Sequence, residues 1–73
     1  MTTDQWKQEI EGALADLGPL WRINKAWVEQ SSPICAAKIA DARGNELLVS
    51  LARDRFATEA DRRVEIVRQL RKL

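Results

Sequence analysis

The sequence contains no histidine and only one cysteine, Cys35. Histidine is the commonest general base and the commonest metal ligand, so its absence excludes Ser–His and Cys–His nucleophiles and two-histidine metal sites. A single cysteine forms no internal disulfide and cannot build a zinc site from several thiolates. The glycines at positions 12, 18 and 44 are too scattered for a phosphate-binding loop. We therefore expect a protein that is not an enzyme and that uses no metal or cofactor.

Long apolar runs are also missing, and none approaches the roughly 20 residues needed to cross a bilayer. Met1 is followed by Thr-Thr-Asp-Gln, which is neither the basic nor the apolar part of a secretory signal. Cys35 lies in an apolar stretch, where a free cysteine usually packs as a small hydrophobe. We therefore expect no membrane contact and a reducing, cytoplasmic location.

The composition is that of one folded domain. Hydrophobic residues make up 45% of the 73 positions and charged residues 32%, a balance that excludes a disordered tail. So short a chain cannot divide its core, and residues 1–73 are predicted to form a single compact domain. The net charge of +1 hides an acidic start and a basic C-terminal third. Such a dipolar chain can steer a charged partner, although +1 is far from the charge of a dedicated nucleic-acid binder.

A first helix is predicted between Thr2 and Gly18. Its apolar residues recur at the spacing of one helical face: Trp6, Ile10, Ala13, Leu14 and Leu17. Thr2 and Gln5 have the spacing of a capping box at its start, and Thr3 is the alternative cap. Gly18-Pro19 ends it, because glycine accepts a left-handed cap and proline cannot continue the helix.

Residues 20–29 alternate well enough to be a strand. Trp21, Ile23 and Trp27 share one parity, but Lys25 shares it with them. The pattern therefore leaves open which face of the sheet the residues near Lys25 occupy.

A hairpin follows the break at Ser31-Ser32-Pro33. Ala42-Arg43-Gly44 is interpreted as its loop, with Gly44 in the left-handed position, so that Asp41 faces Asn45. One face then pairs only apolar residues: Ile39 with Leu47, Ala37 with Val49, and Cys35 with Leu51. The other face pairs Ala40 with Glu46, Lys38 with Leu48, and Ala36 with Ser50. A slip by one residue would mix the two faces, so the pattern predicts this register.

A second helix is predicted near the C-terminus. Thr58 followed by Asp61 resembles a capping box with Asp in place of Glu. The predicted core-facing stripe consists of Ala60, Val64, Val67 and Leu70, flanked by Ile66 and Leu73. Acidic residues near the start and basic residues near the end suit the helix dipole.

The predicted fold class is α+β in the order α-β-β-β-α, a three-stranded antiparallel sheet with two helices packed on one face. This order and the chain length resemble the double-stranded-RNA-binding domain. That family opens its second helix with a lysine-rich, phosphate-binding stretch. The segment in that place here reads Phe56-Ala57-Thr58-Glu59-Ala60-Asp61-Arg62-Arg63. The resemblance is one of topology, and it implies nucleic-acid binding through the second helix.

Two surfaces are candidates for contact with a partner. The first is the basic C-terminal third, in which six arginines and one lysine gather: Arg53, Arg55, Arg62, Arg63, Arg68, Arg71 and Lys72. Guanidinium groups suit bidentate contact with carboxylate or phosphate. A solvated helix with pairs such as Glu65–Arg68 is the alternative interpretation. Arg63 points toward the predicted stripe, so it either extends out along its stem or meets a partner.

The second surface is the outer face of the sheet, where these side chains are predicted to face solvent: Ala36, Lys38, Ala40, Leu48 and Ser50. This flat, lightly polar surface suits another protein or a second copy. Trp27 joins Lys38 and Leu48 as a predicted contact, since an exposed tryptophan is a typical interface anchor. The alternative is that Trp21 and Trp27 both pack at the edge of the core.

We expect a non-enzymatic protein-binding module, an adaptor, regulator or inhibitor. In size and in lack of catalytic groups, the chain also resembles the small bacteriophage proteins that block host machinery, including anti-CRISPR proteins. Nucleic-acid binding through the arginine-bearing helix is the alternative. Homodimer formation through the sheet face or an unpaired edge strand is a further alternative.

Overall fold

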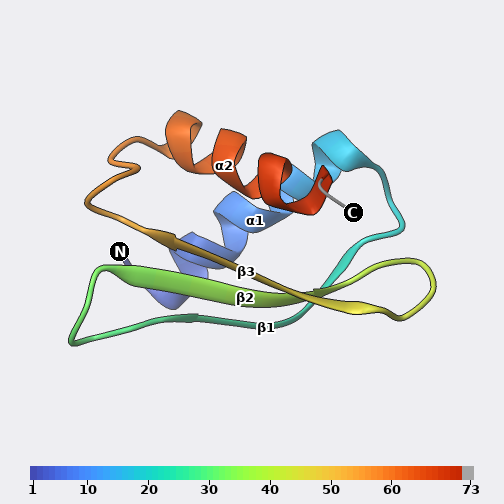
Figure 1. Ribbon diagram of the computed structural model, residues 1–73, viewed down its shortest axis with the longest axis horizontal. Helices are drawn as coiled ribbons and strands as arrows, with labels where there is room; N and C mark the ends of the chain where they lie inside the picture. The colour runs from blue at the N-terminus through green and yellow to red at the C-terminus, as the bar shows by residue number, and fades with distance from the viewer. Residues whose placement is uncertain (72–73) are drawn as a thin grey trace.

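The computed structural model describes residues 1–71, so the predicted surface residue Lys72 and the predicted stripe-flanking residue Leu73 lie outside the described residues. The elements follow the predicted order: α1 (Thr3–Leu17), β1 (Arg22–Val28), β2 (Ile34–Ala40), β3 (Glu46–Ala52) and α2 (Glu59–Arg71). The strands form an antiparallel sheet in the order β1-β2-β3, and both helices lie on one side of it (Figure 1). The α+β prediction is confirmed. None of the helices within residues 1–71 is long and apolar enough to cross a membrane.

The ends of α1 follow the predicted chemistry. The Thr2 hydroxyl accepts a hydrogen bond from the Gln5 backbone N–H at 3.1 Å. At the other end, Gly18 has a φ of +120°, and its N–H donates to the Leu14 carbonyl at 3.0 Å. A side chain is strained at such a φ, so glycine suits this position.

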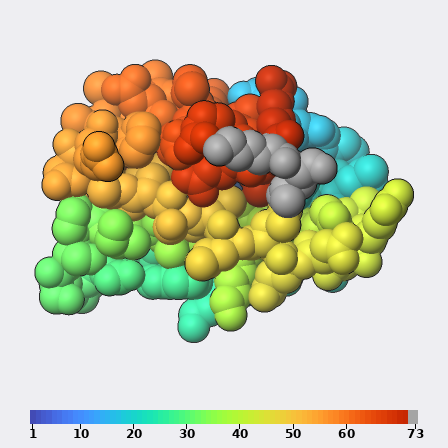
Figure 2. Space-filling model, in the orientation of Figure 1, coloured from blue at the N-terminus to red at the C-terminus, as the bar shows by residue number. Residues whose placement is uncertain are grey.

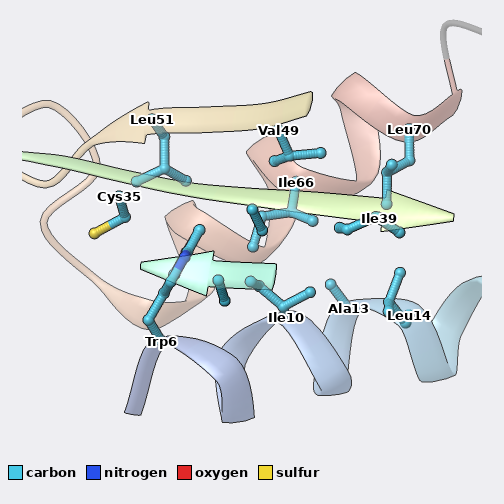
Figure 3. Packing of buried hydrophobic residues seen from close by; sticks show 12 residues of the cluster. Trp6, Ile10, Ala13, Leu14, Cys35, Ile39, Val49, Leu51, Ile66 and Leu70 are labelled. Atoms are coloured by element: carbon cyan, nitrogen blue, oxygen red, sulfur yellow. The ribbon is translucent and has the colours of Figure 1, made fainter. Parts of the chain in front are cut away.

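The core lies between the helices and the inner face of the sheet (Figure 3). Trp6 and Ile10 from α1, Ile39 from β2 and Ile66 from α2 are fully buried there. The indole N–H of Trp6 donates to the Ala36 carbonyl at 2.9 Å, so burial of this side chain leaves no donor unpaired. The same contact fixes the position of α1 along β2.

The β2–β3 hairpin has the predicted register in every pair, from Cys35 with Leu51 to Ala40 with Glu46. At its tip, the Gly44 N–H donates to the Asp41 carbonyl at 3.0 Å, and the φ of Gly44 is +84°. The Asp41 carboxylate accepts the backbone N–H groups of Arg43 and Asn45, each at 2.9 Å. The turn residues and the two-residue period therefore specify the same register.

A β-bulge at Asn24 resolves the open question in β1. Ile23 pairs with Ile39, and the register shifts before Lys25 pairs with Lys38. The extra residue changes the parity of the strand. Ile23 therefore packs against the core, whereas Lys25 and Trp27 lie on the outer face of the sheet. Trp21 and Trp27 are both half-buried, and Trp21 packs against the core cluster.

Two of the five residues predicted to face solvent on the outer sheet face are buried, Ala36 and Ala40. Both lie on the central strand between larger neighbours. Ala36 pairs with Trp27 of β1, and Ala40 pairs with Glu46 of β3. The Asn24 side-chain amide donates to Glu46 at 3.0 Å, which links β1 to β3 across β2. These neighbours shield the short methyl groups of Ala36 and Ala40, so both residues are buried although both helices lie on the other face of the sheet (Figure 1).

The predicted inward stripe of α2 is wrong in its phase. Val64 is 69% exposed and Ala60 is exposed, while Val67 is half-buried. The side that packs inward contains Arg62, Glu65, Ile66 and Leu70. Leu70 of the predicted stripe and Ile66 of its flank lie in the core, and Val67 packs partly against it.

Candidate functional site

A buried ion pair between α1 and α2 explains the orientation of the second helix. Arg62 Nε lies 2.5 Å from Glu9 Oε1, and Arg62 Nη2 lies 3.0 Å from Glu9 Oε2. The remaining nitrogen, Nη1, donates to the carbonyls of Phe56 and Ala57 at 3.0 and 3.1 Å. The hydrogen bond to Glu9 raises the pKa of Arg62, so its charge is retained despite burial. Predicted as a surface contact, Arg62 is instead an internal connection between the helices.

Arg53, another predicted contact, has bonds within the chain. Its Nη2 donates to the Ser32 carbonyl at 2.8 Å and to the Glu29 carbonyl at 3.4 Å. Its backbone N–H donates to the Pro33 carbonyl at 2.8 Å. Arg53 therefore holds the β1–β2 loop against the end of β3.

Arg68 is joined to Glu65 by two hydrogen bonds of 2.7 and 2.5 Å on the flank of α2. This pair confirms the intrahelical spacing that the sequence indicates.

Next to this pair, Gln69 binds the backbone of the edge strand β3. The Ser50 N–H donates to Gln69 Oε1 at 3.2 Å, and Gln69 Nε2 donates to the Ser50 carbonyl at 2.7 Å. The amide thus takes the place of a neighbouring strand at Ser50.

Arg63 and Arg55 are exposed. The guanidinium of Arg63 lies over Gly12 in α1, and a Cβ at position 12 would collide with it. Glycine at position 12 therefore permits this close approach, and the long side chain of Arg63 extends along the surface as its amphipathic stem allows. Arg55 lies in the segment between β3 and α2.

These placements leave an apolar, basic surface on the outward side of α2. We call it the α2 surface and define it by three small apolar residues and three arginines: Ala60, Val64, Val67, Arg63, Arg68 and Arg71. A shallow groove of about 560 Å³ runs along the part of this surface from Arg63 to Arg71, with Asp16 of α1 on its other side. In Figure 2 the atoms of α2, orange to red, form the upper left and centre of the molecule. Such a surface can bury an apolar side chain and pair carboxylates at its margin.

The outer sheet face is the second surface, and it lies on the opposite side of the sheet from the helices (Figure 1). It brings together the predicted contacts Trp27, Lys38 and Leu48, with Leu48 64% exposed. Lys25, which the sequence left unplaced, joins them, and its Nζ lies 5.3 Å from the centroid of the Trp27 ring. This surface therefore combines an aromatic ring, an exposed leucine and two ammonium groups.

The position of Glu9 in the sequence was a signal for the buried ion pair, but the apolar pattern of the helix did not take it into account. Glu9 lies three residues after Trp6 and next to Ile10, inside the apolar face of α1. A carboxylate at such a position needs a buried cation. The pattern alone did not identify Arg62 as that cation.

Comparison with protein-family models, with curated proteins and with solved structures gave no match to this chain. No function is therefore transferred from a relative. A function must instead be inferred from the two surfaces described above.

Proposed function

We propose that the chain is a non-enzymatic protein-binding module, an adaptor, regulator or inhibitor, which holds an acidic amphipathic helix of its partner along the α2 surface. The observation that supports this most directly is the 69% exposure of Val64 in the middle of a packed helix. Inhibition of a larger assembly, of the kind anti-CRISPR proteins perform, is one activity that such docking produces. The buried free thiol of Cys35 suits a reducing, cytoplasmic setting.

The outward position of Val64 is fixed by the residues on the other side of the helix. Arg62 and Glu9 form a buried pair, and Ile66 is fully buried beside it. Rotation of α2 to bury Val64 would pull Arg62 away from Glu9 and leave a charge unpaired in the interior. Breaking such a pair costs about 3–5 kcal/mol, more than the roughly 1.5–3 kcal/mol gained by burying one valine. Burial of Val64 therefore requires a partner.

The spacing of the apolar residues indicates the shape of that partner. Ala60, Val64 and Val67 are separated by four and three residues, which places them in a row along one side of the helix. A second helix can lie along such a row and place its own apolar residues in the groove. The small side chains on α2 allow close approach of the two helix axes.

The charges around the groove indicate the chemistry of the partner. Arg63 and Arg71 are exposed beside the groove, and the Arg68 side chain, which is paired with Glu65, is 51% exposed. Asp16 is the one acidic residue that lines this groove within the described residues. Arginine binds carboxylates with two parallel hydrogen bonds, so glutamate or aspartate flanking an apolar stripe is the complementary pattern. We expect this attraction to raise the association rate and to weaken with salt.

Selection from a yeast-displayed library of helical peptides tests this proposal. The selected peptides should combine an apolar stripe with flanking Asp or Glu, and Val64→Asp should abolish their binding. Leu20→Asp is the matched control, because Leu20 is similarly exposed at 67% but lies outside the α2 surface. Selected peptides without acidic residues, or equal loss of binding in Leu20→Asp, would contradict the proposal.

Nucleic-acid binding through α2 is the weaker candidate. Glu59 and Asp61 occupy the first turn of the helix, where a phosphate would approach. Of the arginines nearby, Arg62 is buried in its pair with Glu9, and Arg53 is bonded to loop carbonyls. These contacts favour a protein partner on this side of the molecule.

A further inference from the structure

The outer sheet face contains a cluster that the proposed protein contact does not use. The bulge at Asn24 turns Lys25 and Trp27 to this face, where Lys25 pairs directly with Lys38 of β2. Without the extra residue, Lys25 would have the same parity as Ile23 and would face the core. The bulge therefore determines that two ammonium groups and an indole ring share one open surface.

Lys25 and Lys38 are unfavourable neighbours unless an anion lies between them. Like charges at directly opposite positions of a sheet destabilise it. Neither lysine forms an ion pair with any carboxylate in the described part of the chain, residues 1–71. The nearby carboxylate of Glu46 accepts a hydrogen bond from Asn24. Arg22, opposite Ala40, adds a third exposed cation to the same face.

Trp27 distinguishes this cluster from a simple anion site. Its ring lies beside the charge, with Lys25 Nζ 5.3 Å from the centroid. An aromatic ring on an open sheet is a stacking platform for an unpaired base. A base that stacks on the ring would displace the ammonium, and a phosphate oxygen of the same strand is the natural new partner for it. Leu48, beside Lys38, offers apolar contact to a neighbouring base or sugar.

We infer that the outer sheet face binds single-stranded nucleic acid, with a phosphate held between Lys25 and Lys38 and a base stacked on Trp27. A duplex keeps its bases stacked on one another and cannot use the ring. An acidic peptide can use the lysines but has no base to stack. Because this face lies on the opposite side of the sheet from the helices, a strand bound there leaves the α2 surface free (Figure 1).

Fluorescence anisotropy with short labelled oligouridine and oligothymidine at low salt tests the inference. Lys38→Glu and Trp27→Leu should each weaken binding by about tenfold, since stacking and phosphate contacts each contribute at about this level. Two phosphate contacts predict that log K falls with log salt at a slope of about −1.4. Val64→Asp should leave strand binding unchanged, which separates this site from the α2 surface.

Lys7→Glu is the matched charge control, because Lys7 is exposed on α1 and the substitution changes the net charge equally. It should leave the affinity unchanged. No binding to either oligonucleotide at low salt, or equal weakening by Lys7→Glu, would overturn the inference. Equal affinity for a duplex or for polyglutamate would also overturn it, in favour of a general anion surface. Thermal melting of each variant shows whether it remains folded, and Lys38→Glu tests the site even where Trp27→Leu unfolds.

Discussion

Glu9 of α1 and Arg62 of α2 form a two-bonded ion pair in which Glu9 is 5% and Arg62 9% exposed. The residues are 53 positions apart, so the pair connects the two ends of the chain. Arg62 also binds the carbonyls of Phe56 and Ala57, which fixes the segment that leads into α2. The pair thereby determines which side of α2 packs inward and which side is presented to a partner.

Removal of one member of this pair should destabilise the fold strongly. Arg62→Ala leaves the Glu9 carboxylate buried without its cation, and we expect a loss of about 3–5 kcal/mol in the free energy of unfolding. Urea denaturation followed by tryptophan fluorescence measures this loss. In the double variant Glu9→Leu/Arg62→Met, two apolar side chains replace the two charges. Its loss should be smaller than that of Arg62→Ala. It should also be smaller than the sum of the losses in Glu9→Leu and Arg62→Met measured separately, and a loss equal to that sum would contradict the assigned pairing.

The amide of Gln69 should protect the edge of the sheet. Gln69→Ala removes both of its hydrogen bonds to Ser50, so the Ser50 N–H should exchange faster with solvent. The exposed edge should also increase self-association, measured by light scattering at high protein concentration. Gln8→Ala, on the exposed side of α1, is the control and should change neither property. Unchanged exchange at Ser50 in Gln69→Ala would show that the amide does not bind the edge.

The hairpin tip should give the protein a component of acid sensitivity. Desolvation would raise the pKa of Asp41, but hydrogen bonds from the backbone N–H groups of Asn45 and Arg43 and from the Asn45 amide outweigh it and lower that pKa. The folded state then binds fewer protons than the unfolded state. This part of the stability is therefore present above the ordinary value of 3.8 and is lost as the pH falls through the lower folded value.

Asp41→Asn tests the acid sensitivity, because its side-chain oxygen can accept the same N–H groups but does not titrate. As the pH falls below about 4, the free energy of unfolding should decrease less in the variant than in the original protein. Denaturant unfolding at each pH measures this difference. Identical pH dependence in the two proteins would contradict the role assigned to Asp41.

The hairpin was predictable because two independent local signals agree. Gly44 accommodates the positive φ that this turn requires, and the two-residue period then separates the apolar pairs from the polar ones. Capping at Thr2 and Thr58 was likewise visible, and the Thr58 hydroxyl accepts the Asp61 N–H at 3.1 Å. These features depend on residues that are close together in the sequence.

The features that escaped prediction depend on distant residues or on an irregular backbone. The apolar periodicity placed Val64 in the core, because it counts only apolar residues. It does not include Arg62, which packs inward because Glu9 of α1 pairs with its charge. The bulge at Asn24 reverses the parity of β1, and no apolar pattern records an extra residue. The wrong phase of α2 and the undecided facing of β1 concern the two surfaces that we assign to partners, where local preference and final packing disagree.

Cysteine reactivity provides the most direct test that α2 presents Val64 to a partner. In the free protein, Val64→Cys should react rapidly with a thiol reagent, and Ile66→Cys should react slowly because Ile66 is fully buried. The native Cys35 gives little background, since burial raises the pKa of its thiol. Addition of a selected acidic helical peptide should slow labelling at position 64 and leave position 66 unchanged. Fast labelling at position 66, or no protection at position 64 when the peptide is bound, would contradict the proposed orientation of α2 and its role in binding.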